Sequence, residues 1–397
     1  MKQKQKTIKV GINASFLRKP NNGTGQVTSN FLGKLIEKNW KSLERNIQYV
    51  LYLEEDIDWK LPGNFQKRVF LPFWKRDDLI RKIWWEKYLL PNQVKKDECN
   101  ILLSLYQCPT ILRSYGKIRH LMFVHDIIPK LFPEYLNDWR KKIYWNLTEK
   151  AIGKADKIIV NSVHSEKDLI RHLRLSASDI SVNHIDVDEI YKKEVSEEKK
   201  ERIMAKYDIK RGYIYAGGGM EVRKNIEGVI RAYGALLEKN KKEHFLSYFP
   251  NLVVSGKLLP QLAPLITDAE KLVRELNLTA HVRLLDFVPQ EDLPALYSCA
   301  SVFVYPSFYE GFGLPILEAM NQNTPVVTAR NSSLEEVGGD AVQYCHPDIL
   351  EDVANAVRNV LLNKSHRHEL VRRAKDRASR FSWDEFTDKM LEYFTNS

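Results

Sequence analysis

The chain has 397 residues, of which 44% are hydrophobic, 28% charged and 11% aromatic, with 18 glycines and 16 prolines that follow no period. At about 150 residues per domain, this length suggests two domains with ample cores, and the composition excludes collagen-like, coiled-coil and disordered chains. Residues 1–200 carry 37 Lys and Arg against 25 Asp and Glu, whereas the remainder carries 24 against 26. The first half therefore holds the whole excess of a +10 net charge, and we expect a polyanionic partner for it, either nucleic acid or an anionic membrane surface.

The sequence also bears on the compartment. The longest uncharged stretch, Leu293–Tyr309, is broken by two prolines and is shorter than the roughly 20 apolar residues that a membrane span needs. Lys9 interrupts any apolar run that a signal peptide would need after the Lys-rich start. The four cysteines show no C-x-x-C spacing and are expected to be reduced thiols. We therefore expect a cytoplasmic protein, whose basic half is compatible with a peripheral position on the inner membrane face.

Apolar runs alternate with amphipathic stretches along the whole chain, which predicts an α/β protein with parallel sheets. In the first half, strands are expected near 9–13, 49–54, 68–73, 100–105, 120–125, 157–161 and 180–185, and helices near 26–39, 78–90, 137–154 and 165–173. In the second half, strands are expected near 213–216, 252–255, 282–287, 301–305, 325–329 and 342–345, and helices near 226–239, 267–276, 291–300, 314–322 and 350–362.

These elements predict two Rossmann-like, doubly wound domains that face a central cleft. The first domain is expected over 1–190 and the second over 211–375. Residues 191–202 are charged throughout and poor in large apolar side chains, so we expect a solvated linker over 191–210, and this composition is compatible with a helix. A C-terminal helix over 376–397 is expected to pack back toward the first domain.

The most informative string runs from Tyr305 to Met320, Tyr-Pro-Ser-Phe-Tyr-Glu-Gly-Phe-Gly-Leu-Pro-Ile-Leu-Glu-Ala-Met. A strand ends at Tyr305, a loop carries Glu310 between glycines, and Pro315 suits the first turn of a helix. Glu318 then falls about one turn inside that helix. Both carboxylates are placed to face the carboxyl edge of the sheet, where open α/β sheets bind ligands. Two isolated acids at this spacing would otherwise be a helix-dipole partner and a solvated loop acid.

A second string, Tyr-Ala-Gly-Gly-Gly-Met-Glu-Val-Arg-Lys-Asn from Tyr215 to Asn225, follows a strand and precedes a helix. Gly218 and Gly219 allow a turn beside a helix start that favours anions, and Arg223 and Lys224 are two adjacent cations that can neutralise a diphosphate. The glycine spacing differs from the Gly-x-Gly-x-x-Gly of dinucleotide-binding proteins. The string therefore indicates a diphosphate site.

Together these strings resemble the Glu-x7-Glu signature and phosphate loop of the family 4 retaining GT-B glycosyltransferases, the group 1 glycosyltransferases. The Arg-Lys-Asn string, with His-Asp-Ile-Ile-Pro at 125–129 and Phe-Pro-Glu at 132–134, most resembles their mannosyltransferases. The resemblance implies that Glu310 contacts the donor sugar, Glu318 holds the ribose, and the backbone at Phe287 and Val288 meets the base. It also places Gly311, Phe312, Gly313 and Leu314 at the donor, and Arg223 and Lys224 on its diphosphate. One departure is that Gly219 stands where many members place an arginine.

The first half supplies the remaining candidates. His125 follows a strand and would lie beside the transferred sugar in related enzymes, although such a histidine is as often satisfied by backbone. Gly23 and Gly25 open a helix after the first strand, where relatives bring a glycine-rich loop to the donor or the acceptor. Residues 182–188 replace the Asn-Gly-Val-Asp type of segment that is usual at that point of the family.

Residues 67–96 carry nine Lys and Arg against three acids, interleaved with Phe70, Phe73, Trp74, Trp84, Trp85 and Tyr88. Basic and interfacial aromatic residues suit an anionic bilayer surface; the alternative is that the aromatics pack in the core beneath a solvated basic face. No nucleic-acid recognition motif accompanies the charge, so no nucleic-acid partner is expected. The Asp-x-Asp strings Asp56/Asp58 and Asp186/Asp188 resemble the metal-binding motif of GT-A transferases, but neither has the surrounding fold, and they are expected to be surface acids. No His/Cys/Asp cluster has metal-ligand spacing, so no metal site is predicted.

We therefore expect a retaining, metal-independent hexosyltransferase without a cofactor. Its donor would be a nucleotide diphosphate sugar, with GDP-mannose first, and its acceptor a glycan or lipid-linked acceptor in polysaccharide assembly. In this hypothesis Glu310, His125, Lys224 and Arg223 are the catalytic residues. The alternatives are a nucleotide-sugar epimerase of the same fold and a non-catalytic nucleotide-sugar-binding protein.

Overall fold

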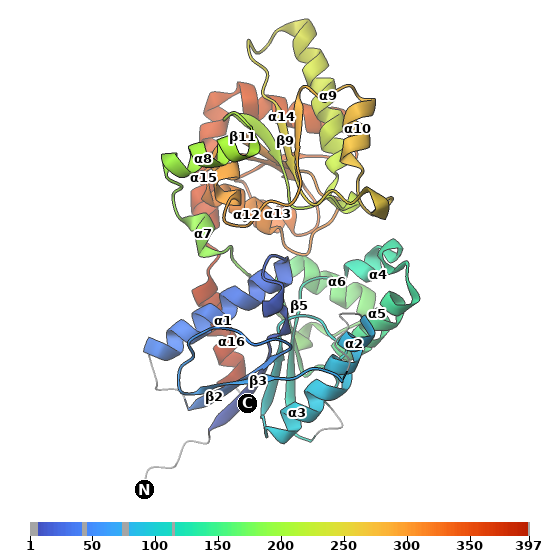
Figure 1. Cartoon of the computed structure of the whole chain (residues 1–397), viewed down its shortest axis with the longest axis vertical. Coiled ribbons are helices and arrows are strands. Elements are labelled where there is room, and N and C mark those ends of the chain that lie inside the picture. Colours follow the sequence, from blue (N-terminus) through green and yellow to red (C-terminus); the bar gives the residue numbers. More distant parts are fainter. Residues whose placement is uncertain (1–6, 42–45, 74–78, 113–115, 396–397) are drawn as a thin grey trace. The chain divides into compact units, whose positions relative to one another are not determined.

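A computed structural model describes residues 7–41, 46–73, 79–112 and 116–395. The chain divides into two units, Met1–Ile185 with Ser382–Ser397 and Asp186–Phe381. Each unit has its own parallel sheet with helices on its faces (Figure 1). This is the doubly wound α/β architecture that the alternation of strands and helices predicts.

The first unit is built on a seven-stranded sheet in the order β3-β2-β1-β4-β5-β6-β7. Its strands are β1 (Ile8–Asn13), β2 (Ile47–Leu53), β3 (Phe65–Val69), β4 (Ile101–Ser104), β5 (Arg119–Val124), β6 (Lys157–Val160) and β7 (Ile180–Val182). We expected the third strand over 68–73, but β3 begins three residues earlier, at Phe65, and ends at Val69. Phe65 pairs with Tyr49 and stacks on its ring, whereas Pro72 has no N–H to give to a ladder.

The helices of the first unit are α1 (Gly23–Lys41), α2 (Leu79–Trp84), α3 (Leu90–Lys96), α4 (Ile128–Leu131), α5 (Trp139–Ile152), α6 (Val163–Leu173) and α16 (Trp383–Thr395). A π-helical turn, Trp85–Leu89, joins α2 to α3. The C-terminal helix α16 lies beside α1 and against β1 (Figure 1). Phe386 anchors α16 through edge-on contacts with Phe31 and Phe123, so the end of the chain completes the first unit.

The second unit is built on a six-stranded sheet in the order β10-β9-β8-β11-β12-β13. Its strands are β8 (Tyr213–Ala216), β9 (Leu252–Ser255), β10 (Val282–Leu285), β11 (Ala300–Tyr305), β12 (Val326–Ala329) and β13 (Gln343–Cys345). Its helices are α7 (Glu189–Lys192), α8 (Glu197–Tyr207), α9 (Ile226–Glu243), α10 (Ala269–Glu275), α11 (Leu293–Ser298), α12 (Leu314–Asn321), α13 (Leu334–Gly338), α14 (Leu350–Leu362) and α15 (Lys364–Ala378). Strands β8, β9 and β12 are buried over their whole length, as parallel strands covered on both faces are.

Residues 191–210, which we expected to form a solvated linker, lie within α7, α8 and their flanks. Helix α8 contacts α11, and Ile203 and Met204 on its inner face are buried. Asp292, just before α11, accepts hydrogen bonds from Lys206 and Tyr207. The charged residues that made this stretch resemble a linker therefore form the outer face of an amphipathic helix.

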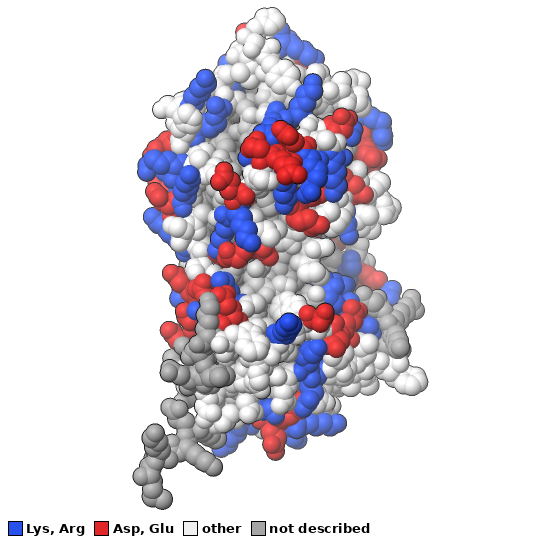
Figure 2. Space-filling model, turned by 60° about the vertical axis from the view of Figure 1, so that its left-hand side comes forward, with Lys and Arg blue, Asp and Glu red and all other residues white. Residues whose placement is uncertain are grey.

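Charge and cysteine placement complete the description. On the face drawn in Figure 2, basic and acidic side chains are interspersed on both units rather than separated into two fields. All four cysteines are buried and free. No helix among the described residues is long and apolar enough to cross a membrane.

Candidate active site

The strand order of the second sheet places two of the predicted loops side by side. The order reverses between β8 and β11, and ligands of open α/β sheets bind outside the carboxyl ends of the strands at such a reversal. The loop after β8 contains Gly218 and Gly219, whose φ angles are 93° and 114°. A Cβ on Gly218 would lie 2.9 Å from the ring of Tyr305 at the end of β11. Only glycine fits there, so the loop packs directly on the end of β11.

A buried ion cluster joins the two loops. The Glu310 carboxylate lies 2.9 Å from Lys224 Nζ and 2.9 Å from Arg223 Nη1. It also accepts hydrogen bonds from the Tyr305 hydroxyl at 2.7 Å and the Ser307 hydroxyl at 2.8 Å. Burial opposes ionisation of Glu310, but Lys224 and Arg223 outweigh it and hold its pKa at about 2. The sequence placed these residues at one site; the structure joins them directly.

The charges of this cluster balance one another. Arg223 also pairs with Glu221 at 2.6 Å, and Lys224 donates to the Tyr305 hydroxyl at 2.6 Å. Two cations therefore face two carboxylates. A ligand with its own negative charges could take over the cations, and Glu310 would then be free to accept hydrogen bonds from the ligand.

Glu318 occupies a separate, less polar environment on α12. Its carboxyl group accepts a hydrogen bond from Tyr297 at 2.8 Å, and Tyr191 lies against the same group. Burial raises the pKa of Glu318 to about 7, although the Tyr297 hydrogen bond and the nearby Tyr191 hydroxyl oppose this shift. Such a carboxyl group is poised to accept hydrogen bonds from paired hydroxyls of a ligand, since this would stabilise its charged form.

The remaining candidates of the second unit extend along the same sheet edge. Phe287 is exposed after β10, and Val288 beside it is buried. The ammonium of Lys257, which follows β9, lies 5.4 Å from the Phe287 ring centroid. A Cβ on Gly256, the residue before Lys257, would lie 3.2 Å from the Cα of Gly219. Phe287 and Val288, which we predicted to meet the base, therefore lie at the same sheet edge as the loop after β8.

Residues 311–314 shape the turn into α12. Gly313 has a φ of 120° and precedes Leu314, the first residue of the helix. Ser333 donates hydrogen bonds to the carbonyls of Glu310 and Phe312. The Phe312 side chain is buried and packs edge-on against Phe381. Phe312 therefore supports the turn from inside, and Gly311 lies between it and Glu310.

His125, Gly23 and Gly25 belong to the first unit. His125 Nε2 lies 3.0 Å from the Leu105 carbonyl, and burial lowers its pKa to about 4. The neutral ring donates Nε2–H to that carbonyl, which leaves the Nδ1 lone pair as its acceptor. Gly25 is in the first turn of α1, where a Cβ would collide with the Lys19 carbonyl at 2.0 Å. Gly23 is the first residue of that helix.

Sequence reasoning did not single out several members of the site. Tyr305 and Ser307 hold Glu310, and their place at a strand end was a usable signal. Tyr191 and Tyr297 hold Glu318; Tyr191 lay in the stretch that resembled a linker, so nothing marked it. Lys257 follows a strand and a glycine, the same pattern that identified the loop after β8.

The two acid pairs have structural roles. Asp56 pairs with Lys67 at 2.6 Å. Asp186 is buried rather than on the surface, where it pairs with Lys192 at 2.5 Å, and Asp188 caps α7. Among the residues that the structure describes, no group of three or more His, Cys, Asp or Glu is arranged to hold a metal ion.

Comparison with known proteins identifies the family. The model of "Glycosyl transferases group 1" matches residues 198–377, and that of "Glycosyltransferase Family 4" matches residues 48–189. The chain is 31% identical over 291 residues to O-antigen chain mannosyltransferase B of Escherichia coli, covering 73% of this chain and 74% of the relative. The chain belongs to the family 4, group 1 glycosyltransferases.

Two further likenesses fit this assignment. The serotype-specific mannosyltransferase WbdA of E. coli is 27% identical over 274 residues, which are 68% of this chain and 32% of WbdA; the chain thus spans about a third of that relative. The crystal structure of Anabaena HepE with UDP and glucose aligns over 99% of this chain and 100% of its own with a TM-score of 0.71 and 16% identity. This confirms the predicted GT-B fold, and the chain is a GT-B glycosyltransferase.

Proposed function

We propose that this protein is a retaining hexosyltransferase that moves mannose from GDP-mannose to a glycan or lipid-linked acceptor in polysaccharide assembly, without a metal ion or other cofactor. The observation that carries the proposal is the buried Glu310–Arg223–Lys224 cluster at the switch point of the second sheet. It combines two cations with a carboxylate whose hydrogen-bonding capacity is freed when the cations take another partner.

In the proposed reaction, the donor diphosphate draws Arg223 and Lys224 away from Glu310. The bond from the anomeric carbon to the diphosphate oxygen breaks as the acceptor hydroxyl oxygen bonds to that carbon. The leaving diphosphate gains negative charge and takes up the hydroxyl proton. Fixed cations in a buried loop stabilise that charge, which is the task a metal ion performs in other transferases. Glu310, released from the cations, accepts hydrogen bonds from the sugar hydroxyls.

Two further residues orient the donor. Glu318, which lies against Tyr191 and Tyr297, accepts hydrogen bonds from the ribose hydroxyls. His125 accepts a hydrogen bond from a sugar hydroxyl at Nδ1 because its Nε2–H is held by the Leu105 carbonyl. A neutral histidine with a pKa of about 4 would remain in this state across the physiological range.

The choice of mannose and of a glycan or lipid-linked acceptor rests on the relatives, two of which are named as mannosyltransferases and one as acting on an O-antigen chain. The nucleotide donor rests on the phosphate loop and on the fold neighbour that binds UDP and glucose. The base is proposed as guanine on the mannosyltransferase likeness, and Phe287 and Val288 would contact it.

A membrane position is proposed for the first unit. Trp84 at the end of α2 and Tyr88 in the π-helical turn are exposed, and their ring centroids lie 5.0 Å apart. Trp139 and Ile143 on α5 are also exposed, and α2 contacts α5; we call these four residues the exposed apolar set. Lys87 and Arg140 lie over its Tyr88 and Trp139 rings. Phe70 and Trp85 instead stack in the core, and Trp74 lies outside the described residues. The segment 67–96 therefore lies partly in the core, and its exposed aromatic residues support contact with an anionic bilayer.

The membrane proposal predicts that Trp84→Ser/Trp139→Ser abolishes sedimentation with anionic phosphatidylglycerol vesicles at low salt. Trp139 is 62% exposed and Trp40 on α1 is 60% exposed, so Trp40→Ser is a matched control that should sediment like the wild type. A wild-type protein that stays in the supernatant, or equal loss in the control, would contradict the proposal.

The catalytic proposal is tested by a thermal-shift panel of GDP-, UDP- and dTDP-sugars in EDTA. GDP-mannose should raise the melting temperature most, and no shift with any donor would count against the site. Product analysis by NMR should then show the α-anomer of the donor retained in the new linkage. Conversion of the sugar without any acceptor would instead indicate an epimerase.

A further inference from the structure

The second unit contains another cavity, at the opposite edge of its sheet. It has a volume of about 450 Å³ and is lined by the segments that lead into β8, β9 and β10. These are the amino ends of the strands, whereas Glu310 and Lys224 follow the carboxyl ends of β11 and β8. The cavity is therefore separate from the proposed donor site. Its volume is within the roughly 300–1,000 Å³ typical of ligand sites.

The lining of this cavity is polar and positively charged. Its cations are Lys210, Arg211 and Arg283, and its one acid is Asp208. Arg283 pairs weakly with Asp208 at 3.8 Å, and Arg211 pairs with Glu197 on α8 at 2.6 Å. Lys210 makes no ion pair with any residue that the structure describes. The cavity thus retains positive charge after its internal pairs are counted.

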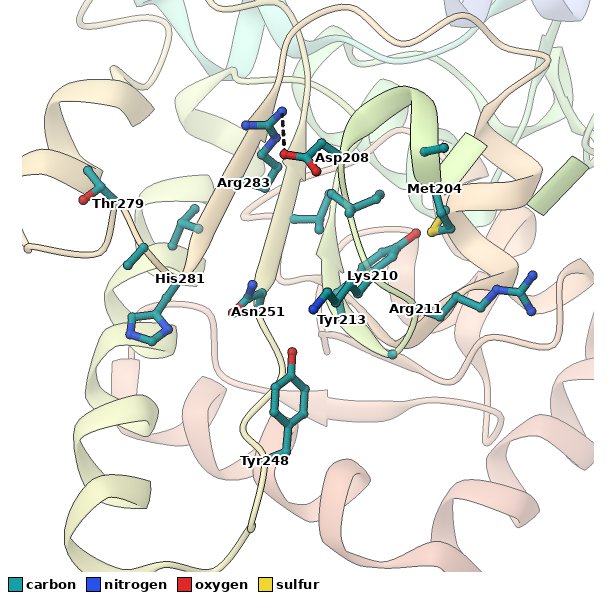
Figure 3. A pocket seen from close by; sticks show the side chains of 16 residues that line it. Met204, Asp208, Lys210, Arg211, Tyr213, Tyr248, Asn251, Thr279, His281 and Arg283 are labelled. Atoms are coloured by element: carbon teal, nitrogen blue, oxygen red, sulfur yellow. Dashed lines mark ion pairs between the residues drawn. The ribbon is translucent and has the colours of Figure 1, made fainter. Parts of the chain in front are cut away.

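The arrangement of the side chains restricts the ligand further. Figure 3 shows Arg283 at the top of the view beside Asp208, Lys210 below them with Asn251 to its left, and Arg211 farther to the right. Separated cations suit a ligand with several separated negative charges better than a single phosphate. Tyr248 at the rim is 64% exposed, and its ring face is available to stack on an apolar ligand face.

We propose that this cavity binds an anionic sugar chain, one that carries carboxylate or phosphate groups along its length. Lys210 and Arg283 pair with successive anionic groups, the Asn251 amide bonds sugar hydroxyls, and the Tyr248 ring packs on a pyranose face. The role of such a site, holding the growing product away from the donor site, rests on the proposed function. The binding itself does not.

The experiment is calorimetric titration with hexagalacturonate, a carboxylated oligosaccharide, and with neutral mannohexaose as a reference. Hexagalacturonate should bind the wild-type protein, and its affinity should fall at least tenfold in Lys210→Ala/Arg283→Ala and further in Lys210→Glu. The control Lys241→Ala/Arg274→Ala removes two cations from the outer faces of α9 and α10 and should leave binding unchanged. Melting temperatures with GDP-mannose, measured on each variant, report whether the fold and the donor site are intact.

Four results would overturn the inference: no binding of hexagalacturonate to the wild type, equal binding by the cavity variants, equal binding of mannohexaose, or tighter binding of a single-stranded oligonucleotide. Failure of the proposed function would look different, since GDP-mannose would then produce no thermal shift while hexagalacturonate still bound.

Discussion

At the residue scale, the central feature is that Glu310 pairs with both Arg223 and Lys224 of the loop after β8. Replacing it should therefore separate binding from catalysis. In Glu310→Gln, Arg223 and Lys224 lose their carboxylate partner, so affinity for GDP should rise by up to about tenfold, roughly 1.4 kcal/mol, while kcat falls. Lys224→Met should lower both, with kcat down by about 10²–10³ as for loss of one transition-state donor.

These two variants are compared by titration with GDP and by steady-state kinetics. The control is Lys271→Met. Lys271 is exposed and forms a weak pair with Glu275 at 3.8 Å, so this substitution should change neither the affinity for GDP nor kcat. Equal weakening of GDP binding in Glu310→Gln and Lys224→Met would show that the carboxylate does not compete with the diphosphate.

Glu318 should make both stability and donor binding depend on pH. Burial raises its pKa from 4.5 to about 7. The contribution of the neutral carboxyl group to the free energy of unfolding is therefore fully present below pH 4.5 and is lost as the pH rises to 7. Ribose hydroxyls favour the charged form, so donor affinity should rise about tenfold from pH 6 to pH 8.

GDP-mannose is the appropriate ligand because both of its phosphates are esterified and do not titrate in this range. In Glu318→Gln the slope of affinity against pH should vanish. A slope that survives this substitution would assign the titration to another group.

At the scale of elements, the loop after β8 depends on glycine for its close packing on β11. In Gly218→Ala, the new Cβ would lie 2.9 Å from Tyr305 in a backbone of φ 93°, which should cost about 2–3 kcal/mol of unfolding free energy and displace Tyr305 from Glu310. Gly63→Ala, with no atom within 4 Å of the Cβ, is the control. Urea unfolding measures the difference, and a Gly218→Ala protein as stable as its control would contradict this packing.

Helix α16 gives a second prediction at this scale. Phe386 is fully buried between Phe31, Phe123 and Trp383, so Phe386→Ala should cost about 3–5 kcal/mol and expose α1 to faster hydrogen exchange. Exchange in the second unit should not change, because α16 belongs to the first. Uniform acceleration in both units would show that the two do not unfold separately.

At the scale of the whole molecule, periodicity predicted how many strands there are and where along the chain they lie, because buried parallel strands are short apolar runs that alternate with amphipathic helices. The order of the strands in each sheet, and hence the contact of the 217–225 and 306–313 loops, is set by long-range pairing that periodicity does not report. β3 was misplaced because Leu71 and Phe73 extend the apolar pattern past Val69.

The candidate site was predictable in its residues and not in its contacts. Glycines, adjacent cations and paired acids at strand ends identify the loops. The ion pairs of Glu310 with Arg223 and Lys224, and the position of Tyr191 against Glu318, could not be predicted from the sequence. These contacts depend on how segments far apart in the chain meet. The aromatic residues of 67–96 divide between core and surface for the same reason, since only packing decides which face of each helix is covered.

A crystal structure of the protein with GDP-mannose bound would show whether the diphosphate displaces Glu310 from the cations. We expect the diphosphate within hydrogen-bonding distance of Lys224 Nζ and the Arg223 guanidinium, the Glu310–Lys224 pair of 2.9 Å opened, and Glu318 in contact with the ribose. A sugar nucleotide bound elsewhere, with the Glu310 pairs intact, would contradict this expectation.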